Sequence, residues 1–412
     1  MIKLISQLNT VTDQNRSISY GSNESLSIES TKNDKQKKII LHIAGSAETD
    51  YYASLSIWYA KQCAESLQHK VSDCMEFIFA CIHPKKNKKN VYDAIWIFPQ
   101  KLNHEISENY RYQKYSFNDA CKKLQNLNIS VCIHHMFDPS GTVQYRQLLI
   151  DLNIPFIGSN PDTMSITNDK QKFRKLMQKN DIPVPFGISF MKHKESLADI
   201  KTMLNDVNIE YPLIVKPCTA DNSIGVSFID KQSDLEQAIN NAFEYDDCII
   251  IEKYIELGRE IRIGIIENEY GKPDIMLPCI EYGVGKTHPI RTESDKLTVI
   301  ESYDNDQHKL EKVYAKSRLT VEVGCKISKE LREKLKNYAF KAHKIMGARD
   351  FSLYDLRIDP NGNPYFIEAN LFCSFAPYSV IISMAQATND DKLNHVELFK
   401  YMVNKACKKI RY

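Results

Sequence analysis

Short apolar runs alternate with amphipathic segments between residues 38 and 158. The runs typical of buried strands cover residues 38–44, 75–82, 131–134 and 155–158. The segments with a helical repeat of apolar positions cover residues 54–67, 119–127 and 142–152. Strands that alternate with helices form parallel sheets, so the pattern predicts an N-terminal α/β domain with a parallel sheet over residues 38–160.

A second and smaller unit follows. A helix is predicted to begin at Lys170, with Asn168 as its N-cap. The strands predicted after it cover residues 211–216, 225–229 and 249–251. We therefore expect a central domain over residues 161–252 and a further domain over residues 253–412.

The first 37 residues have a different composition from the rest. They are rich in Ser, Asn and Lys and contain few large apolar side chains. Such a segment cannot bury enough apolar surface to fold by itself, so we expect a polar, disordered extension over residues 1–37.

Composition narrows the class of protein. The chain of 412 residues is 43% hydrophobic and 26% charged, with a formal net charge of +2, so nothing in it requires a nucleic-acid partner. No apolar run reaches the roughly 18 residues that span a bilayer, so no membrane partner is expected. The 11 cysteines form no Cys-x-x-Cys pair, which favours reduced thiols and a cytoplasmic location.

One segment near the C-terminal end carries candidate chemistry. Two apolar-rich runs between Asp355 and Asn370 flank a turn centred on Asn361-Gly362, which is the pattern of a β-hairpin. Pairing that is symmetric about this turn places Asp355 directly opposite Glu368, with Asn370 on the same face as Glu368. Like charges directly opposite each other destabilise a sheet.

Two interpretations of this hairpin are open. A hard divalent cation such as Mg²⁺ or Mn²⁺ would favour the convergence of Asp355, Glu368 and Asn370, because it prefers carboxylate and amide oxygens. Alternatively, the face is exposed and water keeps the charges apart.

A second candidate lies upstream, where Lys216 ends an apolar strand. The small and polar segment 217–224 follows, and a new strand begins at Gly225. A turn of this kind can fold over a phosphate chain and donate backbone N–H groups, while the lysine supplies a positive charge. A solvent-exposed lysine at a strand end is the alternative, and the same holds for Lys170. The segment 252–255 leaves a buried strand and is either a hinge beside a flat base or a surface turn.

Taken in order along the chain, short motifs resemble those of the ATP-grasp superfamily, and within it those of the D-alanine–D-alanine ligases. The motifs are Asn168-Asp169-Lys170, Val215-Lys216-Pro217, the segment that ends at Gly225, Ile251-Glu252-Lys253-Tyr254, Gly258-Arg259-Glu260, Asp355 and Glu368-Ala369-Asn370. The resemblance extends from about residue 39 to about residue 400. It implies an α/β N-terminal domain, a small α+β lid domain, and a C-terminal domain with an antiparallel sheet, with ATP between the last two.

The resemblance also implies a role for individual residues. The residues that match the ATP-binding set are Lys170, Lys216, Glu252, Lys253, Ile255, Glu260 and Lys316. The residues that match the ligands of two magnesium ions are Asp355, Glu368 and Asn370. The substrate-side matches are Asp50, His134, Asn222, Leu353 and Ser379. The groups expected to take part in catalysis are Lys216, Ser223, Lys316 and Arg349.

The departures from the family pattern lie on the substrate side. The family has an arginine two residues before the metal-binding aspartate, near the reacting carbon and the acceptor carboxylate, and here that residue is Leu353. A serine of the lid corresponds to Asn222, and segment 371–377 is bulkier and more apolar than in the family. Arg349 and Arg291 are the candidates for the missing cation.

The resemblance implies an ATP-dependent ligase that forms a peptide bond through an acyl phosphate and releases ADP and phosphate. The departures favour small amino-acid-like acid and amine substrates other than two D-alanines. Family members are often homodimers, and the resemblance implies the same here. Two alternatives stay open: a D-alanine–D-alanine ligase of cell-wall synthesis, and a non-catalytic ATP-binding protein.

Overall fold

The computed structural model describes residues 37–86, 88–102, 112–256, 258–304, 309–316 and 320–408. Of residues 293, 296–304, 309–316, 320 and 321 it describes the backbone alone. The predicted extension over residues 1–37 lies outside the described residues, except for Lys37.

The N-terminal sheet has the strand order β4-β3-β2-β1-β5. Its strands are β1 (Lys38–Gly45), β2 (Met75–His83), β3 (Ile95–Ile97), β4 (Lys114–Tyr115) and β5 (Ile129–His134). Strand β1 pairs in parallel with β2 and with β5, as predicted, whereas β3 and β4 add two antiparallel pairings at one edge. The sheet is therefore mixed, because an aromatic segment that the apolar pattern left unassigned supplies the two edge strands.

Helices and short turns connect these strands. They are α2 (Asp50–Leu67), η1 (Gln68–Lys70), α4 (Phe117–Asn126), the π-helical turn η2 (Gly141–Tyr145), α5 (Arg146–Asp151) and α6 (Pro161–Thr167). The strand predicted at residues 155–158 is reduced to one parallel bridge between Phe156 and Cys132.

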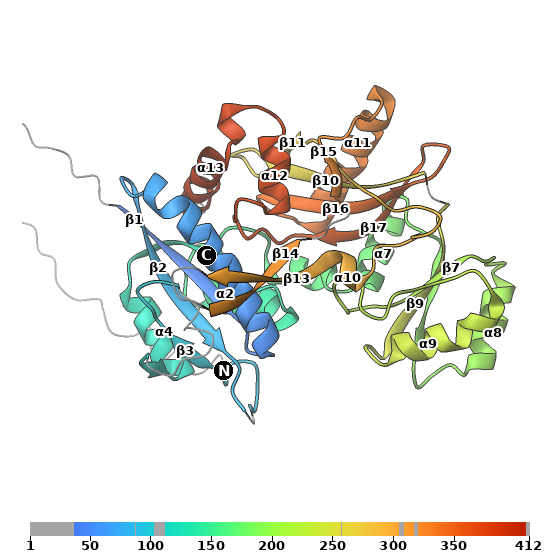
Figure 1. Ribbon diagram of the computed structural model, residues 1–412, viewed down its shortest axis with the longest axis horizontal. Coiled ribbons are helices and arrows are strands. Elements are labelled where there is room, and N and C mark those ends of the chain that lie inside the picture. Colours follow the sequence, from blue (N-terminus) through green and yellow to red (C-terminus); the bar gives the residue numbers. More distant parts are fainter. Residues whose placement is uncertain are drawn as a thin grey trace, which may run out of the picture. The chain divides into compact units, whose positions relative to one another are not determined.

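The central sheet is antiparallel throughout and has the order β6-β9-β7-β8. Its elements are β6 (Gly187–Met191), α8 (Leu197–Asp206), β7 (Leu213–Pro217), β8 (Ser227–Ile229), η3 (Gln232–Asp234), α9 (Leu235–Phe243) and β9 (Cys248–Lys253). Helix α9 packs on β7 and β9 (Figure 1). The apolar side chains of this sheet and its two helices form a separate core.

Helix α7 (Lys170–Lys179) begins at the predicted residue, but with a different cap. The side chain of Asp169 accepts hydrogen bonds from the backbone N–H groups of Gln171 and Lys172, so the prediction of Asn168 as the N-cap is wrong. Two apolar residues of this helix, Phe173 and Met177, are buried with the C-terminal sheet and not with the central one.

The C-terminal sheet is antiparallel, as expected, with the order β15-β12-β10-β16-β17 and with β11 paired to β10. Its strands are β10 (Arg259–Glu267), β11 (Pro273–Met276), β12 (Ile280–Tyr282), β15 (Thr320–Val323), β16 (Phe351–Ile358) and β17 (Pro364–Asn370). A separate hairpin joins β13 (Leu297–Asp304) to β14 (Lys309–Lys316). The helices are α10 (Glu293–Lys296), α11 (Lys329–Met346), α12 (Val380–Gln386), η4 (Asp391–Leu393) and α13 (His395–Lys408).

One apolar core is shared between the N-terminal sheet and the last two helices. Side chains of β1, β2 and α2 are buried in the same cluster as side chains of α12 and α13. The rings of Phe77 on β2 and Phe399 on α13 illustrate the contact, with centroids 5.9 Å apart. The predicted boundary at residue 160 therefore lies between parts that are packed together, and the domain boundaries stay predictions.

The N-terminal sheet also buries a pair of histidines. The Nδ1 atom of His42 lies 3.0 Å from the Nε2 atom of His135, and the ring planes are only 11° apart. This is the geometry of one N–H···N hydrogen bond between neutral imidazoles. Burial lowers the pKa of His135 to about 3, which keeps the pair uncharged. Cys63 lies nearby in the same core.

A buried carboxylate at the end of β10 links several segments around the shared core. Glu267 accepts hydrogen bonds from Lys405 Nζ at 2.6 Å, from the backbone N–H of Asp350 at 2.6 Å, and pairs with His343 Nε2 at 3.1 Å. Asp350 in turn accepts from the backbone N–H of Gly158 at 2.7 Å. Burial alone would raise the pKa of Glu267, but the hydrogen bonds from His343 and Lys405 outweigh it and lower the pKa to about 2.

Removing this charge should destabilise the fold. We expect Glu267→Gln to lower the free energy of unfolding at pH 7 by about 3 kcal/mol, because Lys405 loses its closest partner in a buried place. The folded-state pKa is lower than the unfolded one, so the wild-type contribution is present above about pH 4.3 and is lost as pH falls towards 2. The variant should therefore lose less stability than the wild type between pH 5 and pH 2, measured by urea unfolding.

Glu281→Gln is the matched control. Glu281 pairs with Arg259 on the same sheet, but both side chains are partly exposed, so its loss should cost less than about 1 kcal/mol. An equal loss of stability in the two variants would contradict a special role of Glu267.

Candidate active site

The hairpin formed by β16 and β17 presents three oxygen-bearing side chains on one face. Asp355 lies directly opposite Glu368, as predicted, and Leu353 lies opposite Asn370. The register shifts by one residue between Asp355 and Leu356, so the pairing is not symmetric all the way to the turn. At the turn, Gly362 has a φ of 82°, in the left-handed region that a glycine adopts without strain.

Arginine side chains surround the opposed carboxylates. Arg262 lies opposite Asp355 on β10, and its Nε and Nη2 atoms donate to the two carboxylate oxygens, with an Nη2–Oδ2 distance of 2.5 Å. Arg291 donates to Asp355 at 2.8 Å and to Glu260 at 2.6 Å. Arg357 donates to the other oxygen of Glu260 at 2.6 Å.

These contacts keep the site charged. Burial alone would lower the pKa of Arg262, but the charge of Asp355 and the hydrogen bonds to it raise that pKa well above its usual value. Burial would likewise raise the pKa of Glu260, but Arg291 and Arg357 lower it. The arginines therefore offset the repulsion between carboxylates that the sequence predicts.

The donor set of the hairpin suits a hard divalent cation. Asp355 and Glu368 offer carboxylate oxygens, and Asn370 offers an amide oxygen that already accepts from the backbone N–H of Phe372 at 2.9 Å. Such oxygens are the ligands that Mg²⁺ prefers. The three residues fit the predicted metal site, provided that a cation takes the place of a guanidinium on Asp355.

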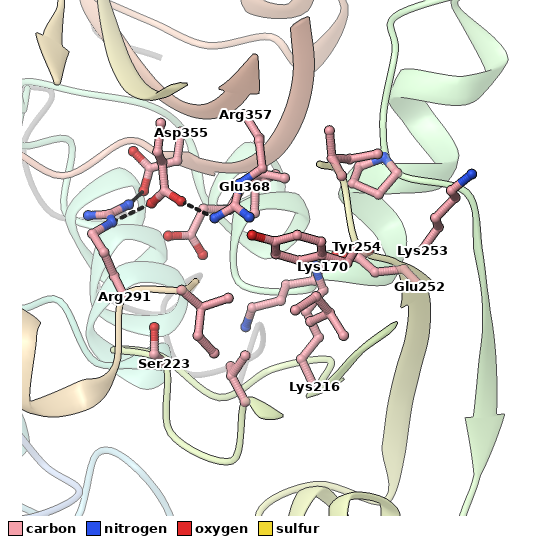
Figure 2. Close-up of a pocket in the computed structure, with 17 residues that line it drawn as sticks. Lys170, Lys216, Ser223, Glu252, Lys253, Tyr254, Arg291, Asp355, Arg357 and Glu368 are labelled. Atoms are coloured by element: carbon pink, nitrogen blue, oxygen red, sulfur yellow. Dashed lines mark hydrogen bonds and ion pairs between the residues drawn. The ribbon is translucent and has the colours of Figure 1, made fainter. Parts of the chain in front are cut away.

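A cavity lies between the central sheet and this hairpin, and its lining includes ten labelled side chains (Figure 2). Lys216 at the end of β7 forms a buried ion pair with Glu252 on β9, and Arg174 of α7 lies 3.4 Å from the second oxygen of Glu252. Lys170 opens α7 and its Nζ atom donates to the backbone oxygen of Ala220. We name this space the nucleotide cavity.

The structure brings together most residues that the resemblance assigned to ATP. The predicted residues that line the nucleotide cavity are Lys170, Lys216, Glu252, Lys253, Ile255 and Glu260, together with Ser223, Asp355 and Glu368. Backbone hydrogen bonds fix the hinge, from Lys253 N–H to Phe186 O at 2.8 Å and from Tyr254 N–H to Pro212 O at 3.0 Å. Lys316 ends β14 opposite Leu297, and its side chain lies outside the described residues.

The loop between β7 and β8 separates this cavity from a second one. Asn222 and Ser223 both have positive φ values, 54° and 64°, which are uncommon for residues other than glycine. Ser223 lines the nucleotide cavity, whereas Asn222 lines the second cavity. The strained turn therefore directs two consecutive side chains to two different spaces.

The second cavity has a volume of about 480 Å³, and we name it the substrate cavity. Aromatic side chains from α2 and from two loops form one wall: Tyr52, Tyr59, Phe137, Phe372 and Tyr378. The rings of Phe137 and Phe372 are 5.5 Å apart, and both approach Tyr59 to about 6 Å. Leu353, Asn370 and Ser379 also line this cavity.

Of the predicted site residues whose side chains the structure describes, three line neither cavity. Asp50 is exposed in the first turn of α2, and His134 is buried at the end of β5 with no hydrogen-bond partner for either ring nitrogen among the described residues. Arg349 reaches Asn160 and lies 5.6 Å over the ring of Phe156, so it does not supply the cation missing at Leu353. Arg291, the other candidate, lines both cavities.

Sequence reasoning missed Arg262, Arg357 and Glu48. Glu48 accepts from the backbone N–H of Ser140 at 3.0 Å, and its charge contributes to the raised pKa of Tyr52 in the wall of the substrate cavity. The spacing of Glu260 and Arg262 was an available signal, because residues two apart on a strand share one face.

Comparisons with known proteins place the chain in a family. A family model described as D-ala D-ala ligase C-terminus matches residues 176–393. The D-alanine–D-alanine ligase of Lactococcus lactis subsp. cremoris (strain SK11) is 26% identical over 249 residues, which cover 60% of this chain and 64% of that protein. The chain thus spans less than two thirds of the length of this relative.

Solved structures show the same fold. The D-alanine–D-alanine ligase of Bacillus anthracis complexed with ATP matches with a TM-score of 0.58 and 19% identity, over 90% of this chain and 97% of that one. The VanG D-Ala:D-Ser ligase of Enterococcus faecalis matches with a TM-score of 0.64 and 19% identity, over 90% and 100%. The fold is therefore an ATP-grasp fold. The chain belongs to the D-alanine–D-alanine ligase family.

None of the helices in the described part of the chain is long and apolar enough to span a membrane.

The buried lysine of the nucleotide cavity provides a test of its role. We expect Lys216→Gln to weaken binding of a non-hydrolysable ATP analogue at least about 10-fold, because a charge-assisted hydrogen bond contributes about 1.5–3 kcal/mol. Isothermal titration calorimetry with Mg²⁺ present measures this. Lys231→Gln, an exposed lysine of the same domain, is the control and should bind like the wild type. Equal affinities of all three proteins would rule out a phosphate contact at Lys216.

Proposed function

We propose that the protein is an ATP-dependent ligase that joins the carboxylate of one amino acid to the amine of a second and releases ADP and phosphate. The observation that carries this proposal is the shared wall of the two cavities. Lys170, Arg291 and Glu368 line both the nucleotide cavity and the substrate cavity. A carboxylate in the substrate cavity can therefore meet the terminal phosphate of a nucleotide at this wall.

The chemistry follows from the residues at the wall. The carboxylate of the first amino acid attacks the γ-phosphorus, the bond from that phosphorus to the β–γ bridging oxygen breaks, and an acyl phosphate and ADP form. Lys170 and Lys216 offset the negative charge that develops on the phosphate oxygens. Asp355, Glu368 and Asn370 would hold magnesium, which would supply further charge neutralisation when bound. The amine of the second amino acid then attacks the acyl carbon, and phosphate leaves.

We propose ATP as the nucleotide and D-alanine as the substrate of both sites. The support is that the relatives named above are D-alanine–D-alanine ligases, and one of the matching structures contains ATP. The expectation of substrates other than two D-alanines, drawn from Leu353 and Asn222, has less support than this alternative.

A different acceptor is the second candidate, and one observation favours it. The substrate cavity has a broad aromatic wall, whereas an alanine side chain is a single methyl group. The D-Ala:D-Ser ligase with the same fold shows that the fold accommodates another acceptor. The non-catalytic alternative is weakened, because Arg262 and Arg291 supply cations near Leu353.

The test is ADP release by the purified full chain with ATP, Mg²⁺ and single D-amino acids or pairs of them, with products identified by mass spectrometry. We expect ADP release that depends on D-alanine, with D-alanyl-D-alanine as the main product. A mixed dipeptide formed at least 10-fold faster would support the second candidate. ATP binding without any amino-acid-dependent ADP release would support the non-catalytic alternative.

Asp355→Asn is the accompanying variant. It halves the carboxylate charge of the proposed metal site and should lower kcat at least about 100-fold, because charge stabilisation of this kind contributes several kcal/mol. Asp359→Asn, at the exposed turn of the same hairpin, should keep wild-type kcat. Full activity of Asp355→Asn would contradict the metal site.

A further inference from the structure

Arg262 and Asp355 stand on opposite sides of the wall between the two cavities. Among the described lining residues, Arg262 lines the substrate cavity and not the nucleotide cavity, whereas Asp355 lines the nucleotide cavity and not the substrate cavity. Their bidentate ion pair joins the adjacent strands β10 and β16 at this point. Arg262 therefore presents its cation to whatever occupies the substrate cavity.

The guanidinium of Arg262 is held in place but keeps donors for a ligand. Its side chain is only 12% exposed, and its guanidinium carbon lies 5.7 Å from the centre of the Tyr282 ring. Bonds to Asp355 engage two of the nitrogen atoms, Nε and Nη2. A guanidinium carries five N–H groups in a planar fork, so the Nη1 end remains for a second carboxylate.

The other cations around the substrate cavity are directed elsewhere. Among the described residues that line it, the remaining cationic side chains are Lys170 and Arg291. Arg291 donates through Nε to Glu260 and through Nη2 to Asp355. Lys170 donates to the backbone oxygen of Ala220 in the loop between β7 and β8. Both side chains also line the nucleotide cavity, where they would bind the phosphate groups of a nucleotide.

The position next to Arg262 on the same face of the sheet has apolar surroundings. Gly264, two residues along β10, lies opposite Leu353 on β16. A Cβ atom at Gly264 would lie 3.3 Å from Leu353 Cδ2 and 3.2 Å from Met384 Sδ, so this patch is closed and offers no polar partner. A carboxylate placed beside this patch would lose part of its hydration, and a charge-assisted bond to Arg262 would offset that loss.

We propose that Arg262 is the specificity-determining residue that binds the carboxylate of the acceptor amino acid. This inference rests on the proposed ligase function, in which the second amino acid reacts through its amine and keeps its carboxylate. A charged carboxylate in a cavity of this kind requires a cation, and a guanidinium fork matches it with two parallel hydrogen bonds.

The inference predicts selection for acceptors with a free carboxylate. D-Alaninamide has the same amine and methyl group as D-alanine but no charge on its carboxyl end. We expect the wild-type enzyme to prefer D-alanine over D-alaninamide as the acceptor by about 10- to 100-fold, the discrimination typical of a charge-assisted hydrogen-bonded pair.

The experiment is a competition assay with the full chain, ATP, Mg²⁺, and equal concentrations of D-alanine and D-alaninamide. Mass spectrometry gives the ratio of dipeptide to dipeptide amide, which equals the ratio of kcat/KM for the two acceptors. In Arg262→Gln the ratio should fall to within about 3-fold of unity. Arg262→Lys keeps the charge but loses the fork, so its ratio should lie between the two.

Arg259→Gln is the matched control. Arg259 lies on the same strand, but pairs with Glu281 away from both cavities, so the variant should keep the wild-type ratio. Should Arg262→Gln form too little product, the lysine variant decides in the same assay. A wild-type ratio in either Arg262 variant, or no preference in the wild-type enzyme, would overturn the role of Arg262 while the ligase function stands. Absence of both products from the wild-type enzyme would overturn the ligase function and this inference together.

Discussion

The opposition of Asp355 and Glu368 on neighbouring strands is the constraint on which the site depends. Two carboxylates cannot share one face of a sheet without positive charge, and the structure supplies it from Arg262 and Arg291. Arg291 and Arg357 also engage Glu260, so one charged layer continues from the nucleotide cavity towards the substrate cavity. The positions proposed for the nucleotide and for the amino-acid substrate therefore depend on how the charges on this sheet are balanced.

Local patterns predicted the parts of the site that neighbouring residues determine. The Asn361-Gly362 turn placed Asp355 opposite Glu368, because a hairpin brings close segments together. The ordered motifs around Lys216 and Glu252 placed both in one cavity. The exact pairing near the turn was not predicted, because a one-residue bulge depends on packing.

Features that depend on distant segments could not be predicted in this way. Arg262 and Asp355 are 93 residues apart in the chain, and their contact requires the register of β10 against β16. Asp50 was assigned from the motif alone, and its side chain lies exposed in the first turn of α2, because the direction of a side chain depends on where the helix begins. Likewise, Leu353 suggested that a cation is missing, whereas the neighbouring strand β10 carries Arg262.

The separate core of the central sheet has a mechanical consequence. The apolar residues of β6 to β9 pack among themselves, whereas those of the N-terminal sheet share a core with α12 and α13. A rotation of the central sheet about the segments at Phe186 and Lys253 would thus break few apolar contacts, whereas parting the other two sheets would expose a whole core. The central sheet is therefore the part of the molecule that could rotate as a unit against the rest, and it carries Lys216.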